Sequence, residues 1–196
     1  MKKLPASFGL LIAAGVVSGL VIQPRSPDAS TAVAQEGKGP SAEQRLKELK
    51  IELPAVTKPT NTLVNAVRVG DMLYVSGTGP GNDDDGKPIV GRLGKKQDLD
   101  APQGRAAARR VGLHILAVVR AELGSLDKVQ RLVKTFGMVN AASDFKEHPQ
   151  VINGFSDLMV EVFGEENGKG ARSAVGMSSL PNGIPVEIEA IFQIRK

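Results

Sequence analysis

The stretch RSAVGMSSLPNGIPVEIEAI, residues 172–191, contains two extended runs on either side of a turn with proline and glycine. Arg172 opens the first run, and the second run places Glu187 and Glu189 among apolar residues. A guanidinium is always charged and presents a planar fork of donors. Beside a partly buried carboxylate it could hold a small carboxylate ligand and act on it. A plain salt bridge between two strands is an equally good interpretation of these residues.

Outside this stretch, the chain alternates between strand and helix patterns. Residues 62–69 and 72–75 flank a Gly-Asp turn and predict a β-hairpin. Apolar residues at helical spacing predict a long helix over 103–123. The other elements that we expect are a short edge segment over 88–93, a strand over 129–139, a helix over 149–163 ended by Gly164, and a closing strand pair over 172–177 and 184–194.

This order of elements predicts an α+β domain over residues 53–196, in which two helices pack on one face of a mixed sheet. Residues 35–52 are expected to form a polar linker and a short helix with Ser41 as its cap. The second face of the sheet would still carry apolar residues. It therefore needs a partner, and self-association is the simplest one.

The N-terminal segment has the features of a secretory signal peptide. Two lysines precede an apolar run over 8–22, and Ala32-Val33-Ala34 offers a cleavage site before Gln35. The apolar run is short for a membrane span. We therefore predict a signal peptide over 1–34 and an exported, periplasmic protein without stable membrane association after cleavage. A membrane tether formed by an uncleaved N-terminus is the alternative.

Composition excludes several classes of function. The chain of 196 residues has no cysteine, which excludes disulfides, thiolate metal sites and a cysteine nucleophile. Its two histidines, His114 and His148, lack metal-binding spacing, so we predict neither a metal nor a cofactor. Cleavage after Ala34 would lower the net charge from +4 to +2. A nucleic-acid partner is therefore not expected, since phosphate binding needs a concentrated basic patch.

Taken together, the motifs of residues 53–196 resemble the RidA/YjgF family of enamine/imine deaminases, also known as the L-PSP endoribonucleases. The matching segments are Gly70–Gly77, the region of Gly91, Leu123–Val129, Asp144-Phe145 with Asn153, Arg172-Ser-Ala-Val, Leu180-Pro and Val186–Ile191. The resemblance implies a chorismate-mutase-like mixed sheet with two helices. It further implies that three subunits form a barrel with ligand sites in the clefts between them.

The resemblance also implies roles for individual residues. Arg172 matches the arginine that grips the substrate carboxylate, and Glu187 matches the glutamate that positions the attacking water. Asn153 matches a helix asparagine with a structural role. The strand-end residues that would line the pocket are Ser76 and Gly77, and the backbone groups that could polarise the ligand lie near Val175 and Gly176.

Two positions depart from the family pattern. Ala174 stands where well-known members have a cysteine, and residues 59–62 lack the tyrosine that helps to shape the pocket. The chain is therefore expected to represent a divergent branch in which deaminase activity does not follow from the resemblance.

Three functions remain open at this point. The first is hydrolysis of 2-imino or 2-enamino acids to 2-oxo acids and ammonia. The second is a trimer that binds a small carboxylate metabolite without turning it over. The third is RNA cleavage, which we rank last because no histidine or acid–base pair is apparent beside a basic groove.

Overall fold

The structure is a computed structural model that describes residues 39–60 and 62–195. These belong to one compact unit over 39–196. The expected signal peptide over 1–34 lies outside the described residues. Within the described part of the chain, no helix is both long and apolar enough to cross a membrane.

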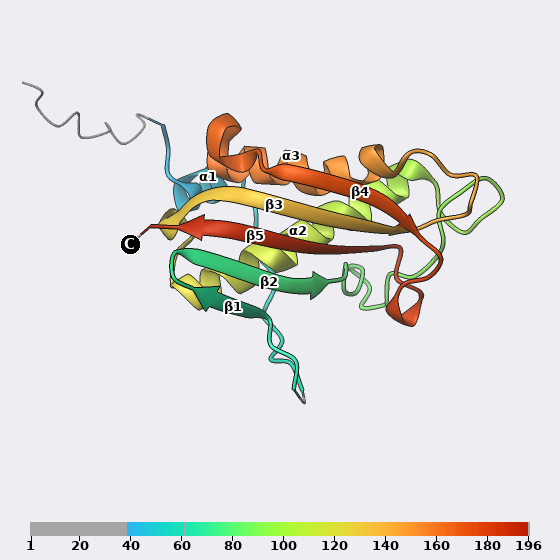
Figure 1. Cartoon of the computed structure of the whole chain (residues 1–196), viewed down its shortest axis with the longest axis horizontal. Helices are drawn as coiled ribbons and strands as arrows, with labels where there is room; N and C mark the ends of the chain where they lie inside the picture. Colours follow the sequence, from blue (N-terminus) through green and yellow to red (C-terminus); the bar gives the residue numbers. More distant parts are fainter. Residues whose placement is uncertain (1–38, 61, 196) are drawn as a thin grey trace, which may run out of the picture. The chain divides into compact units, whose positions relative to one another are not determined.

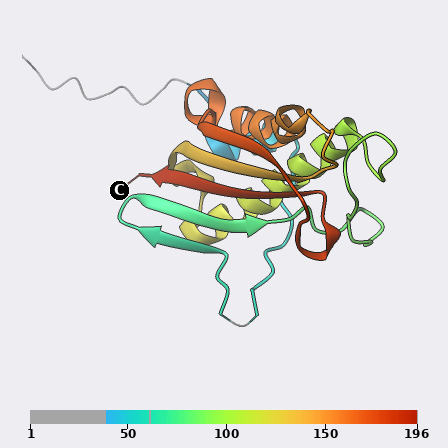
Figure 2. The ribbon, with the colours of Figure 1, turned by 45° about the vertical axis from the view of Figure 1, so that its right-hand side comes forward.

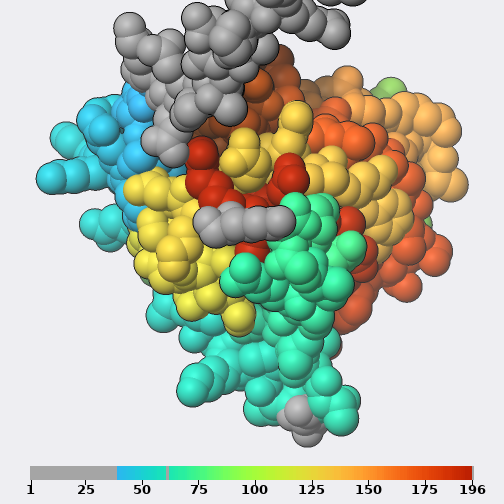
Figure 3. All heavy atoms as spheres, turned by 60° about the vertical axis from the view of Figure 1, so that its left-hand side comes forward, coloured from blue at the N-terminus to red at the C-terminus, as the bar shows by residue number. Residues whose placement is uncertain are grey.

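A mixed five-stranded sheet forms the centre of this unit, as the sequence predicted, and helices cover one of its faces (Figure 1). The strand order is β1-β2-β5-β3-β4. Only β3 and β4 pair in parallel, and the other neighbours are antiparallel. The strands are β1 (Ala66–Val69), β2 (Met72–Thr78), β3 (Val129–Asn140), β4 (Ala171–Met177) and β5 (Val186–Ile194). Figure 3 looks onto the end of the sheet at which β5, in red, finishes next to β2, in green.

The expected pairing of the last two strands is wrong, because β3 lies between them. Thr135 of β3 pairs with Arg172 on one side and with Ala190 on the other. The helix between β3 and β4 makes a parallel crossover, which places β4 beside β3. The chain then passes over the end of β3, where the backbone N–H of Asn140 donates to the Pro185 carbonyl at 2.9 Å.

The two long helices are α2 (Ala101–Leu123) and α3 (His148–Gly168). A capping box between Asp100 and Gln103 starts α2, and Gly124 ends it with a φ of 80°. In α3 the expected end at Gly164 is a break in the backbone with a φ of 81°, after which helical turns continue to Gly168. The predicted edge segment over 88–93 forms isolated bridges and no strand.

The helices and the inner face of the sheet enclose the hydrophobic core. Along β5, the alternate residues Val186, Ile188, Ala190 and Phe192 are all buried in it. Their neighbours Glu187, Glu189 and Ile191 must therefore point to the opposite face. Within the described residues no helix covers that face (Figure 1). It exposes Val67, Val69 and Tyr74 by 49%, 60% and 44%.

The helix α1 (Ala42–Glu48) belongs to the packed unit. We expected residues 35–52 to precede the domain. In the structure, Leu46 is only 2% exposed and packs into the core. The carboxylate of Glu43 accepts two hydrogen bonds from Arg120 of α2, at 3.0 and 2.5 Å. The compact unit therefore begins at Gly39 and not at residue 53.

The packing of α2 on α3 requires a glycine at position 154. A Cβ at this position would overlap the backbone carbonyl oxygen of Arg105 in α2. Gly154→Ala should therefore push the helices apart and lower the free energy of unfolding by about 1–3 kcal/mol. Chemical denaturation would measure this loss, with Glu122→Ala on the exposed side of α2 as control. Equal stability of Gly154→Ala and the unchanged protein would contradict the close helix contact.

Candidate active site

Arg172 lies on the edge strand β4 and points toward α3. Its Nη1 donates to Asn153 Oδ1 at 2.7 Å and to Ser156 Oγ at 3.0 Å, both on α3. Arg172 forms no ion pair with any carboxylate of the described residues. The guanidinium is therefore oriented by neutral partners and keeps its full charge for an external anion. The resemblance implied a structural role for Asn153, but nothing in the sequence indicated Ser156.

Glu187 lies on β5 and points to the uncovered face of the sheet, where its side chain is half-buried. Burial raises the pKa of Glu187, and the neighbouring charge of Glu189 raises it further. No hydrogen bond or ion pair links the Glu187 carboxylate to a described side chain. A carboxyl group with a raised pKa and no fixed partner is suited to receive and return a proton.

Gly77 allows the Glu187 carboxylate to lie against the backbone of β2. A Cβ at position 77 would overlap Glu187 Oε1. The regular pairing of β2 with β5 shifts between Val75 and Thr78, so Gly77 sits in a bulge. Ser76 is next to it, and its hydroxyl donates to the Val64 carbonyl at 2.7 Å. The Glu187 carboxylate thus lies against Gly77, and Ser76 is the residue before Gly77 on β2.

The two charged groups lie on opposite faces of the sheet within one chain. Arg172 pairs with Thr135 of β3, which is buried on the helix side of the sheet, so Arg172 also faces the helices. Glu187 faces away from them. No ion pair joins Arg172 to Glu187 or Glu189, which removes the salt-bridge interpretation for the described chain. One chain therefore holds two separate half-sites.

The two predicted backbone groups on β4 also divide between these faces. Val175 pairs with Met138, which in turn pairs with Glu187, so these three residues form one row across the uncovered face. Gly176 points to the helix side, where a Cβ would lie 2.5 Å from Nε2 of His148. Val175 thus belongs to the Glu187 half-site, whereas Gly176 lies on the helix side beside His148, away from Arg172 along β4.

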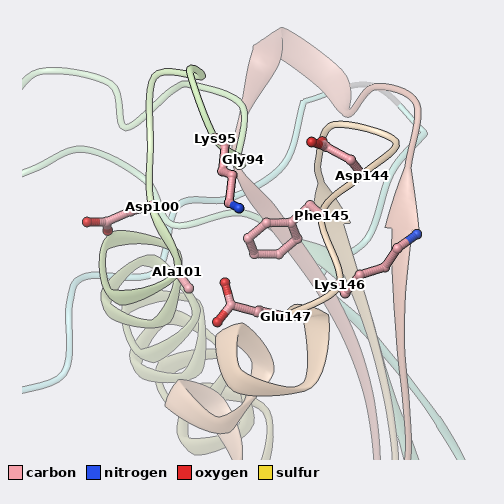
Figure 4. A pocket seen from close by; sticks show the side chains of 8 residues that line it. All are labelled: Gly94, Lys95, Asp100, Ala101, Asp144, Phe145, Lys146 and Glu147. Carbon is pink, nitrogen blue, oxygen red and sulfur yellow. The ribbon is translucent and has the colours of Figure 1, made fainter.

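A hollow of about 530 Å³ lies away from both half-sites, between the start of α2 and the loop before α3. Figure 4 shows the ring of Phe145 at its centre, with the Lys95 nitrogen beside the ring and the Glu147 carboxylate pointing toward Ala101. Asp100 points away, in keeping with its role as the cap of α2. Both acidic and basic side chains line this hollow, and no pattern in the sequence indicated it.

The described residues contain no group of three or more histidine and acidic side chains arranged to hold a metal ion. Three consecutive aspartates, residues 83–85, lie in the loop after β2, and this loop forms a hydrogen-bonded turn. Asp83 Oδ1 accepts from the backbone N–H groups of Asp85 and Lys87, at 3.0 and 2.8 Å. Asp84 forms an ion pair with Arg110 at 2.9 Å.

The charge of Glu189 provides a test of the environment of Glu187. Removing this charge in Glu189→Gln should lower the pKa of Glu187 toward its ordinary value, because one of the two causes of the upward shift is lost. NMR titration of the side-chain carboxyl carbon of Glu187 would measure the change. The matched control, Glu122→Gln on α2, should leave the titration unchanged. An unchanged or higher pKa in Glu189→Gln would contradict the geometry.

Comparisons with known proteins agree with this fold. A family model described as YjgF/chorismate-mutase-like, putative endoribonuclease, matches residues 43–183. Protein TCP17 from Trypanosoma cruzi is 43% identical over 149 residues, which cover 76% of this chain and 91% of that protein.

Two crystal structures are also similar. Atu1372 from Agrobacterium tumefaciens, of unknown function, is 41% identical with a TM-score of 0.67, and the match covers 78% of this chain and 91% of that one. A protein from Shewanella oneidensis, described as a putative endoribonuclease, is 28% identical with a TM-score of 0.72, and the match covers 79% and 100%. The chain therefore belongs to the YjgF/chorismate-mutase-like family, as its resemblance to RidA/YjgF proteins predicted.

Proposed function

We propose that this protein hydrolyses 2-imino or 2-enamino acids to 2-oxo acids and ammonia, in clefts between the subunits of a homotrimer. The main support for the proposal is the environment of Arg172. Its guanidinium donates hydrogen bonds to Asn153 and Ser156, and it has no carboxylate partner among the described residues. A substrate carboxylate would supply the negative charge that Arg172 lacks within the chain.

A cleft between subunits is proposed because a single chain keeps Arg172 and Glu187 on opposite faces of the sheet. A second copy could bring its Glu187 half-site to the Arg172 of the first. The uncovered apolar face supports this association. The segment before β1 supports the association as well. It projects beyond the sheet in Figure 2, and its residues Leu63 and Val64 are 62% and 50% exposed.

In this mechanism Arg172 holds the carboxylate of the imino acid, and Glu187 transfers protons. Water adds to the imine carbon, and its proton passes through Glu187 to the nitrogen. The carbinolamine then gives its hydroxyl proton to the nitrogen, again through Glu187. The carbon–nitrogen bond breaks, ammonia leaves, and the carbonyl of the 2-oxo acid forms. Such imines hydrolyse readily in water, so correct positioning supplies much of the required acceleration.

A carboxylate-binding trimer without turnover is the second candidate. Ala174 and the absence of a tyrosine in 59–62 support it, because both remove side chains expected in the pocket. RNA cleavage ranks last. His114 and His148 lie against Gly81 and Gly176, and neither lies against Glu187 in the described chain.

Ammonia release from 2-iminobutyrate tests the proposal on the full chain. Arg172→Ala should lower kcat/KM by about 100-fold or more, because the charge-assisted contacts to the substrate are lost. Glu187→Gln should lower kcat by about 100-fold to 10,000-fold, since proton transfer is lost. Arg131→Ala, at an exposed arginine of β3, is the control and should retain full activity.

The results separate the candidates. Wild-type turnover by Arg172→Ala would end the proposal. If the unchanged protein releases no ammonia but binds 2-oxobutyrate through Arg172, the non-catalytic candidate replaces it. RNA cleavage that Arg172→Ala and Glu187→Gln both retain would indicate a contaminating nuclease.

A further inference from the structure

A second hollow, of about 370 Å³, lies where β3 and β4 end beside the start of α3. Three basic side chains line it, from Arg92, Lys146 and His148, together with the hydroxyl-bearing Ser143 and Ser178. No aspartate or glutamate is among its lining residues. Figure 4 shows Lys146 turned away from the Phe145 hollow. This second hollow is therefore a concave surface with positive charge and no acidic lining.

Arg92 has no carboxylate partner for its guanidinium, unlike the half-buried Arg109, Arg110 and Arg120. Its Nη2 donates to the Ala141 carbonyl at 2.8 Å, while its Nε is buried without a hydrogen-bond partner. The nearby carboxylate of Asp98 instead accepts from the Arg92 backbone N–H, at 3.1 Å. By contrast, Arg109 and Arg120 each form two hydrogen bonds with a glutamate. No carboxylate of the described residues neutralises the Arg92 guanidinium, so an anion in the hollow would be attracted to it.

The start of α3 lies beside the hollow, because its first residue, His148, lines it. Glu147 at the cap position makes no side-chain capping bond, and Pro149 has no backbone N–H, so only the amides of His148 and Gln150 remain as free donors in the first turn. The positive end of the helix dipole therefore adds to the charge of the side chains.

His148 is held against the wall of the hollow. A Cβ at position 176 would lie 2.5 Å from His148 Nε2, so a glycine is needed there for the ring to approach β4. The ring of Phe145 contacts it edge-on, with centroids 5.3 Å apart. Burial and then the charge of Lys146 lower the pKa of His148. An anion would oppose both effects, because it favours the protonated ring.

We propose that this hollow is an oxyanion site that takes the phosphate group of a small metabolite, separate from Arg172 and Glu187. Arg92 supplies a guanidinium without a carboxylate partner, Lys146 supplies further charge, and His148 supplies an imidazole that a bound anion would help to protonate. A phosphate has more acceptor oxygens and more charge than a carboxylate, so it can engage these groups together.

Inorganic phosphate titrated into the full chain at constant ionic strength tests the site. NMR of the imidazole nitrogens should show a saturable shift of His148 with a Kd of about 1–10 mM, while His114 in the same spectrum stays unmoved. Arg92→Gln should weaken binding by about tenfold or more, and Lys146→Gln by roughly two- to fivefold. Arg131→Gln and Arg172→Ala should leave the affinity unchanged, which separates this site from the proposed deaminase site.

Several results would overturn the inference. One is a His148 signal that does not move on addition of phosphate. The others are an affinity for acetate equal to that for phosphate, and a loss of phosphate affinity in Arg131→Gln equal to that in Arg92→Gln. Thermal melting would check that Arg92→Gln is folded, since Arg92 also supports Ala141. If that variant unfolds, Lys146→Gln and His148→Asn decide the question, and unchanged phosphate affinity in both would refute the site.

Discussion

The pairing of β3 with β4 on one side and β5 on the other is the constraint on which the candidate active site depends. Because β3 separates them, the strands that carry Arg172 and Glu187 are never neighbours. The side-chain alternation of each strand then sends the two groups to opposite faces. Asn153 and Ser156 orient the guanidinium of Arg172, and the bulge at Gly77 leaves room for the carboxylate of Glu187. A single chain therefore keeps Arg172 and Glu187 apart and cannot itself bring both of them to one ligand.

Much of the fold follows from local sequence signals. The hairpin β1–β2 is predicted by its Gly-Asp turn and α2 by its apolar periodicity, although the structure starts α2 at Ala101, two residues before the predicted start. The pairing of β4 and β5 was mispredicted because the Pro181-Asn-Gly turn between them resembles a hairpin connection. Their true positions depend on contacts with β3, which starts about 40 residues before β4, and local patterns do not report such contacts.

The site was predictable to a similar degree. Arg172, Glu187, Ser76 and Gly77 were found through the family resemblance, and their residue types fit the chemistry. Ser156 was missed, because its contact with Arg172 joins a helix to an edge strand across 16 residues. The basic hollow around Arg92 was missed for the same reason. Its members come from three separate parts of the chain, and only folding shows that Arg92 has no acidic partner there.

The central claim is that Arg172 of one copy works with Glu187 of another, and mixed oligomers test it most directly. Arg172→Ala and Glu187→Gln would be co-expressed in equal amounts, and ammonia release from 2-iminobutyrate would be measured on the purified mixture. In random assemblies one junction in four unites both native side chains, so we predict roughly a quarter of the wild-type rate. A rate no higher than that of the two variants measured separately, with mixed assembly verified by native mass spectrometry, would contradict a site shared between subunits.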